Sequence, residues 1–140
     1  MEITANTLQT VGVNQNVLFS ETPVEGSCSI VHRNGSGLVT LRGLTRCQCR
    51  ARFKVFFSGN ISVPTGQTVG PISLAIAING EPVATTTMIS TPAAVEEFNN
   101  VASSLFIHVP SECCSQISVE NVSTIPVNVQ NANLIVERVA

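Results

Sequence analysis

The stretch that decides the fold class is residues 72–88, which read ISLAIAINGEPVATTTM. Large aliphatic residues occupy every second position of its first half: Ile72, Leu74, Ile76 and Ile78. Because alternate side chains of an extended chain point to opposite faces, this pattern predicts a β-strand with one apolar face. The Asn79-Gly80 dipeptide that follows favours the positive φ angles of a tight hairpin turn. The stretch therefore predicts a strand, a turn and a second, threonine-rich strand.

The same period of two recurs along the chain and predicts an all-β domain. Residues 50–57 (RARFKVFF) alternate between apolar and basic positions, which predicts a half-buried strand with a basic outer side. Further strands are expected at residues 16–19, 37–42, 105–109, 116–121 and 127–139. A helix is conceivable only at residues 92–102, where threonine- and valine-rich neighbours favour extended structure. Roughly eight to ten short strands without βαβ alternation predict an antiparallel sandwich or barrel.

Length and composition indicate one domain that is short of charge. The chain has 140 residues, of which 11% are charged. A typical soluble domain carries about 25% charge, so we expect much of the surface to face another protein. Residues 16–140 are expected to form a single domain, with residues 1–15 as an N-terminal extension or arm. The net charge of −2 predicts no nucleic-acid partner, and no apolar run is long enough to span a membrane.

The polar residues predict no catalytic site, no metal and no cofactor. The chain lacks Asp, Trp and Tyr, which excludes an aspartate dyad and an EF-hand. His32 and His108 fall in no nucleophile or metalloprotease motif, and adjacent Glu96 and Glu97 would point to opposite faces of a strand. We therefore expect a protein that is not an enzyme. Residues 1–15 lack a basic segment followed by an apolar one, so no signal peptide is expected.

The order of these segments resembles the C1q/TNF-like jelly roll. An early apolar segment (NVLF, 16–19) precedes residues 37–42 and the aromatic strand 53–57, and ISLAIAINGEPVATTTM follows. A strand ending at Val109-Pro110 and a final pair ending in LIVERVA complete the pattern, which covers most of residues 16–140. The chain resembles in particular the small bacterial and phage versions, which occur as heads of collagen-like spore-surface proteins and as free-standing virion or surface proteins.

The resemblance implies a compact homotrimer in which one sheet of each protomer packs around a threefold axis. The low charge and apolar excess agree, because surface that becomes interior on assembly needs few charges. Four aromatic residues are the candidates for the core or the trimer axis: Phe53, Phe57, Phe98 and Phe106.

The cysteines leave several alternatives open. Cys47 and Cys49 precede the aromatic strand, and Cys113-Cys114 follows the strand that ends at Val109. If those two strands pair antiparallel, as the resemblance implies, the four thiols converge at one end of the sandwich. They would then form one or two disulfides, remain free thiols, or hold zinc, for which the C-x-C and C-C spacings are poor. Cys28 is then the odd residue, either a buried free thiol or a partner between chains.

These features predict a non-catalytic, homotrimeric building block of a phage virion, such as a decoration or fibre-tip protein. Its partners would be copies of itself and capsid or fibre proteins, on a virion or an extracellular surface. One alternative is a surface module that binds a glycan or receptor through residues 58–70 or 87–100. Another is a bacterial spore or cell-surface protein. The cluster Arg46, Arg50, Arg52 and Lys54 would form a solvated or interface-facing strand side, or a contact for an anion or glycan.

Overall fold

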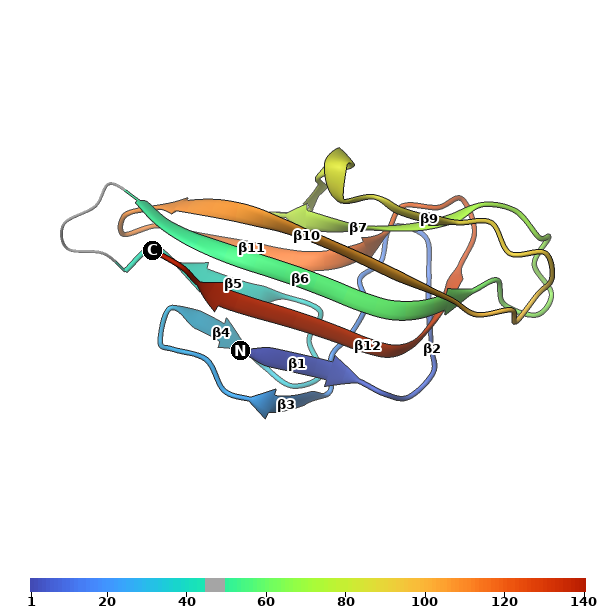
Figure 1. The fold of residues 1–140 in the computed structure, drawn as a ribbon, viewed down its shortest axis with the longest axis horizontal. Helices are drawn as coiled ribbons and strands as arrows, with labels where there is room; N and C mark the ends of the chain where they lie inside the picture. Colours follow the sequence, from blue (N-terminus) through green and yellow to red (C-terminus); the bar gives the residue numbers. More distant parts are fainter. Residues whose placement is uncertain (45–49) are drawn as a thin grey trace.

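The computed structural model describes residues 1–44 and 50–140 and shows two antiparallel sheets packed face to face (Figure 1). The first sheet has the order β10 (Asn99–Pro110), β6 (Arg50–Ser62), β12 (Val127–Arg138), β1 (Glu2–Ala5) and β3 (Glu21–Val24), and β2 (Gln9–Val11) also pairs with β12. The second has the order β4 (Ile30–His32), β5 (Val39–Arg42), β11 (Cys114–Asn121), β7 (Ile72–Ile78) and β8 (Glu81–Pro82), and β9 (Met88–Ser90) also pairs with β7. The predicted all-β antiparallel sandwich is confirmed.

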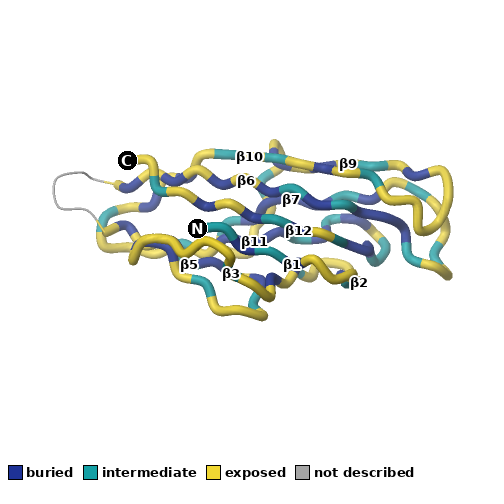
Figure 2. Tube along the Cα trace, turned by 60° about the horizontal axis from the view of Figure 1, so that its bottom comes forward, coloured by how far each residue is buried: buried dark blue, intermediate teal, exposed yellow. Residues whose placement is uncertain are grey.

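The long strands follow the period of two in the sequence. Along β6, Ala51, Phe53, Val55 and Phe57 are buried, and the residues between them are exposed. β6 lies between β10 and β12, and Val55 is opposite Leu105 on one side and Val136 on the other. Figure 2 shows this alternation as buried and exposed colours that exchange along each strand. The predicted half-buried strand with a basic outer side is therefore confirmed.

The core lies between the two sheets and is built around fully buried phenylalanines. Phe19, Phe53 and Phe57 have no exposed surface. The Phe19 ring meets the Phe57 ring edge to face, with 6.4 Å between ring centroids and an interplanar angle of 76°. This arrangement places the positive edge of one ring against the negative face of the other, which adds to the burial of apolar area.

The Asn79-Gly80 turn has the predicted conformation. Asn79 has φ +52° and Gly80 has φ +84°, and together they join β7 to β8. Asn79 also exchanges hydrogen bonds with the Gln116 backbone, since Gln116 N donates to its side chain at 2.8 Å and its own N donates to Gln116 O at 2.7 Å. The turn residue therefore holds the β7–β8 hairpin against β11 as well.

The structure differs from the sequence predictions in three segments. Residues 1–15, the expected extension, contribute β1 and β2 to the first sheet, because Ile3, Ala5 and Val11 are buried against it. Residues 16–19 form one isolated bridge, Asn16 to Glu120, instead of a full strand, although Val17 and Phe19 are buried. The expected threonine-rich strand is replaced by the two-residue β8 and a 3-10 turn over residues 84–86. Residues 92–98 form a loop before β10, so the preference for extended structure over a helix in residues 92–102 agrees with the structure.

Helix is limited to a single 3-10 turn in the described part of the chain. This turn, η1 (Ala84–Thr86), follows β8, and the Thr86 hydroxyl accepts a hydrogen bond from Ile76 N at the edge of β7. No helix among the described residues has the length and apolar character needed to cross a membrane.

One buried amide ties the N-terminal segment to the end of the second sheet. The Asn121 side chain has no exposed surface, and its Nδ2 donates to the carbonyls of Val11 and Ile125 at 3.0 Å and of Gly12 at 3.3 Å. Its Oδ1 accepts from Ser123 N at 2.9 Å. All of its polar atoms are therefore bonded, as burial of an amide requires.

Removal of this amide should destabilise the domain. In Asn121→Ala, the carbonyls that accept hydrogen bonds from Asn121 Nδ2 in the wild type lose their donor. We expect the free energy of unfolding to fall by about 2–4 kcal/mol. Urea denaturation followed by circular dichroism measures this change. The exposed Asn6 offers the matched control, because Asn6→Ala should change stability by less than about 0.5 kcal/mol. Equal midpoints for the two variants would contradict the assigned role of Asn121.

Candidate functional site

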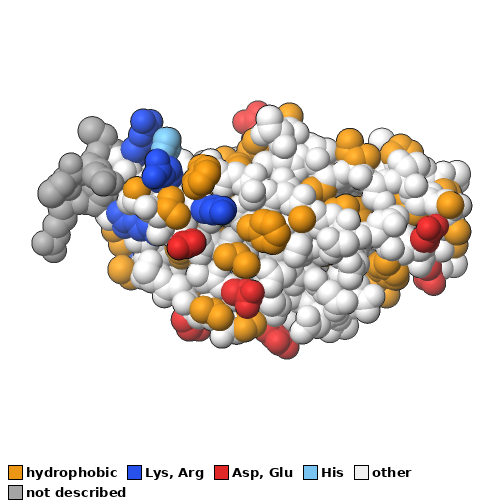
Figure 3. All heavy atoms as spheres, viewed as in Figure 1, with side chains coloured by type: hydrophobic (Ala, Val, Ile, Leu, Met, Phe, Trp, Pro, Cys, Tyr) orange, Lys and Arg blue, Asp and Glu red, His pale blue; other side chains and the backbone are white. Residues whose placement is uncertain are grey.

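The outer face of the first sheet carries large apolar side chains that no described residue of the chain covers. Phe106 of β10 is 63% exposed, Phe56 of β6 is 36% exposed and Ile135 of β12 is 38% exposed. Ile135 lies opposite Phe56, and Phe106 lies opposite Lys54, one step along the same face of β6. The three side chains therefore lie next to one another on three neighbouring strands, and we call them the apolar patch. Figure 3 shows hydrophobic side chains gathered in the middle of this face.

A shallow hollow lies within the apolar patch. It has a volume of about 200 Å³ and is lined by Lys54, Phe56, Ile135 and Glu137. Lys54 lies opposite Glu137 on β12, so the two charges stand on neighbouring strands at one side of the hollow. The hollow is therefore apolar on one side and charged on the other.

A second feature of this face is its basic end, formed by Arg50, Arg52, Lys54 and His108. The first three occupy alternate, exposed positions of β6, and His108 lies opposite Arg52 on β10. The Arg52 guanidinium carbon is 5.9 Å from the centroid of the Phe106 ring, within the range of a cation–π interaction. Figure 3 shows these basic side chains at the left end of the face, next to the hydrophobic centre.

The opposite half of the same face is polar and uncharged. Ser58 and Asn60 continue the outward positions of β6, and Asn100 of β10 lies opposite Asn60. Asn100 Nδ2 donates to Asn60 Oδ1 at 3.1 Å and to Gly59 O at 3.3 Å. Along β6 the face therefore changes from basic to apolar to amide-rich.

The four candidate phenylalanines separate into two groups. Phe53 and Phe57 lie in the intrachain core with no exposed surface. Phe106 lies on the outer face, and Phe98 is 38% exposed in the loop before β10, so neither belongs to the core. The sequence analysis missed Phe56, although the alternation that places Arg52 and Lys54 outward also places Phe56 there. It also missed Ile135, whose position depends on the pairing of β12 with β6.

The strand pairing expected near the cysteines is confirmed. β6 and β10 are antiparallel, and Arg50 at the start of β6 lies opposite Pro110 at the end of β10. Gly43 N donates to Cys113 O at 2.9 Å, which brings Gly43, two positions before residue 45, to the same turn. Cys47 and Cys49 lie outside the described residues. Cys113 and Cys114 are exposed, and so is Cys28, which contradicts the alternative of a buried thiol for that residue.

The two histidines and the acidic pair lie apart and have separate surroundings. His32 is on β4 of the second sheet, where its Nε2 lies 3.0 Å from Ser36 O, and exposed His108 is on β10 of the first sheet. Glu96 accepts a 2.8 Å hydrogen bond from Thr65 Oγ1, and Glu97 accepts from the backbone N of Ala93 at 3.0 Å. Among the described residues, no three His, Cys or Glu side chains lie close enough together to hold a metal ion.

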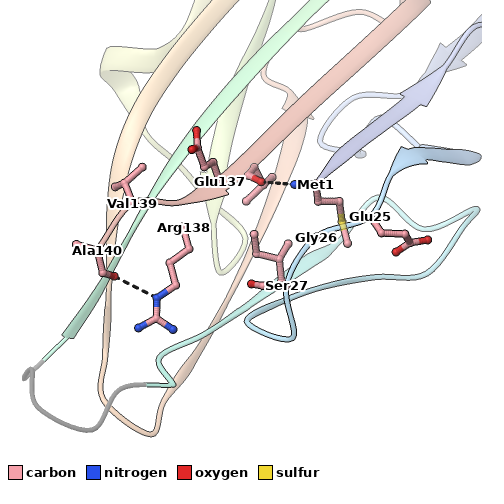
Figure 4. A pocket seen from close by; sticks show the side chains of 10 residues that line it. Met1, Glu25, Gly26, Ser27, Glu137, Arg138, Val139 and Ala140 are labelled. Atoms are coloured by element: carbon pink, nitrogen blue, oxygen red, sulfur yellow. Dashed lines mark hydrogen bonds between the residues drawn. The ribbon is translucent and has the colours of Figure 1, made fainter.

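A larger hollow of about 620 Å³ lies beside both chain ends (Figure 4). Two of its polar groups already have partners within the chain: the Met1 amino group donates to Val136 O at 2.7 Å, and Arg138 Nε donates to Ala140 O at 3.1 Å. Arg138 also reaches Ser29 Oγ at 2.9 Å, which links β12 to the loop before β4. Arg138 therefore closes one end of the sandwich and is not available for a ligand.

Comparison with solved structures identifies the fold. The globular domain of zebrafish complement 1qA protein superposes with a TM-score of 0.69 at 10% identity, over 99% of this chain and 95% of that one. Murine APRIL superposes with a TM-score of 0.58 at 10% identity, over 98% of this chain and 99% of that one. No family model and no curated protein matches the sequence. The chain therefore has a C1q/TNF-like jelly-roll fold, as predicted, and the likeness extends to the fold alone.

Peptide mapping of unreduced protein tests the predicted disulfides. Gly43 bonds to Cys113 and Arg50 pairs with Pro110, so described residues on either side of positions 45–49 lie near the Cys113–Cys114 turn. We therefore expect peptides carrying Cys47 or Cys49 to be linked to those carrying Cys113 or Cys114. Mass spectrometry before and after reduction detects such linked peptides. Complete alkylation of all five thiols in protein prepared without reductant would support free thiols instead.

Proposed function

We propose that the chain is a non-catalytic structural protein that assembles as a homotrimer through the outer face of β10, β6 and β12. In this proposal it serves as a building block of a phage virion, as a decoration or fibre-tip protein. The observation that carries the proposal is the apolar patch, in which Phe106 exposes 63% of its surface beside Phe56 and Ile135.

Burial of this face would stabilise an assembly. Apolar surface removed from water contributes about 25 cal/mol per Å², and a stable interface buries about 800 Å² on each partner. The apolar patch covers three adjacent strands, and the amide-rich half beside it adds area without the desolvation of charge. With 11% charged residues, the chain has few charged groups that such a contact would have to remove from water.

The trimeric state and the virion setting have different support. A threefold arrangement around one sheet is what the resemblance to C1q/TNF-like domains implies, and the exposed apolar patch supports the first sheet as the one that would face the axis. The virion setting rests on the resemblance to the small phage versions of this fold. The proposal of a non-catalytic role agrees with the separate positions of His32 and His108 on different sheets.

A charge in the apolar patch should prevent assembly. We expect light scattering of the wild-type protein to give three times the 14.8-kDa chain mass, and of Phe106→Glu to give the chain mass. The substitution removes the most exposed side chain of the apolar patch, and assembly would require a carboxylate to leave water. The monomeric variant should retain the circular dichroism spectrum of the wild type, since Phe106 lies outside the core.

Ile89 on β9 of the second sheet offers a matched control. It is 67% exposed, close to the exposure of Phe106, so Ile89→Glu should leave the mass unchanged. A wild-type protein that is monomeric at millimolar concentration would overturn the proposed homotrimer. A trimer that Phe106→Glu leaves intact would place the interface elsewhere.

A second candidate function is recognition of a glycan or receptor by loops at one end of the sandwich. Two predicted recognition segments do meet there, because Glu96 N donates to Val63 O at 2.8 Å and Thr65 Oγ1 donates to Glu96. Val69, Val95 and Phe98 are exposed in these loops.

Binding to an array of glycans tests this second candidate. A glycan ligand should bind the wild type and lose at least about tenfold in affinity in Phe98→Ser, a loss of about 1.4 kcal/mol. The monomeric variant Phe106→Glu should keep the glycan affinity of a single site of the wild type. An array without any bound glycan would exclude glycans as the ligand of these loops.

A further inference from the structure

We propose that the basic end is one third of an oxyanion site, which the basic ends of two further protomers complete on the threefold axis. The ligand would be a free tetrahedral oxyanion with at least two negative charges, namely phosphate or sulfate. This inference rests on the proposed homotrimer and adds a ligand to it.

The basic end and the apolar patch are continuous on the sheet. Phe106 lies opposite Lys54, and the Arg52 guanidinium carbon is 5.9 Å from the centroid of the Phe106 ring. A contact that brings Phe106 of three chains together therefore brings three copies of Arg52 and Lys54 close to one another. His108, opposite Arg52, adds a further ring nitrogen at the same level.

The basic end has more positive charge than the carboxylates around it can balance. Arg50, Arg52 and Lys54 face a single carboxylate side chain on the adjoining strand, Glu137, which leaves an excess of two positive charges per chain (3 − 1). Three such ends around one axis repel each other, and an anion between them would offset that repulsion.

The donors of the basic end have no partners in the described part of the chain. Arg138 shows the contrast, because its guanidinium donates to Ser29 Oγ, Leu44 O and Ala140 O and is used within the protomer. The side chains of Arg52 and Lys54 make no hydrogen bond with the described residues. The Arg52 guanidinium carbon lies 5.9 Å from the centroid of the Phe106 ring, so its N–H groups are available to an external acceptor at the apolar patch.

A tetrahedral oxyanion suits the symmetry of this arrangement. When one of its oxygens lies on a threefold axis, the other three are equivalent and face the three protomers. Arginine offers forked N–H donors to such oxygens, and lysine adds a compact positive charge. Chloride has neither several acceptors nor a second charge, so the proposed site should distinguish it from phosphate.

Calorimetric titration with inorganic phosphate tests the proposal. The trimeric protein is titrated in chloride buffer at constant ionic strength, and we expect one phosphate bound per three chains. The double variant Arg52→Gln/Lys54→Gln should bind phosphate at least tenfold more weakly. Arg33→Gln is the matched control, because Arg33 is exposed in the loop after β4, outside the basic end, and its loss should leave phosphate affinity unchanged.

Methyl phosphate provides a second arm that distinguishes a free ion from an esterified one. A closed axial site should bind the ester more weakly than inorganic phosphate, whereas equal binding would overturn the assignment to a free ion. A trimer that binds no phosphate, or binds one per chain, overturns the axial site and leaves the homotrimer standing. Equal phosphate affinity in the wild type and the double variant also overturns it. A monomeric wild type overturns the proposed function and the axial site together.

Discussion

The pleat of β6 is the constraint on which the rest of the structure depends. Successive side chains of a strand point to opposite faces, so Phe53, Val55 and Phe57 enter the core only if Arg52, Lys54 and Phe56 point outward. A shift of one residue in the pairing with β10 and β12 would exchange the two sets and place two cations in the core. The register that builds the core therefore also builds the outer face.

The two sheets use their outward positions differently. On β7 these positions hold Ala75 and Ala77, which are fully buried within the protomer, so this part of the second sheet is complete without a partner. On the first sheet the corresponding positions hold two phenylalanines and an isoleucine that remain exposed. Such a face leaves apolar area exposed to water, which is unfavourable. Contact with another copy would remove that exposure. The larger exposed side chains of the first sheet support the proposal that its outer face forms the interface.

Charge is also distributed unevenly along the molecule. The basic residues of β6 stand at one end of its outer face, and the other half carries serine and amide groups. A side chain at the closed end of the sandwich, Arg138, has the same charge but a structural role, because three acceptors surround it. Whether a cation serves the fold or a ligand therefore depends on its neighbours and not on its type.

The sequence by itself determined the fold class, the existence of strands β6, β7 and β12, and the Asn79-Gly80 turn, because period two and turn chemistry are local properties. It also determined that Phe53 and Phe57 share a face. Only the tertiary structure decided that residues 2–11 complete the first sheet, that Phe106 joins Phe56 and Ile135, and that Phe98 lies in a loop. These facts depend on which strands become neighbours, and strand neighbours are chosen by burial summed over the whole sandwich, which no single segment encodes.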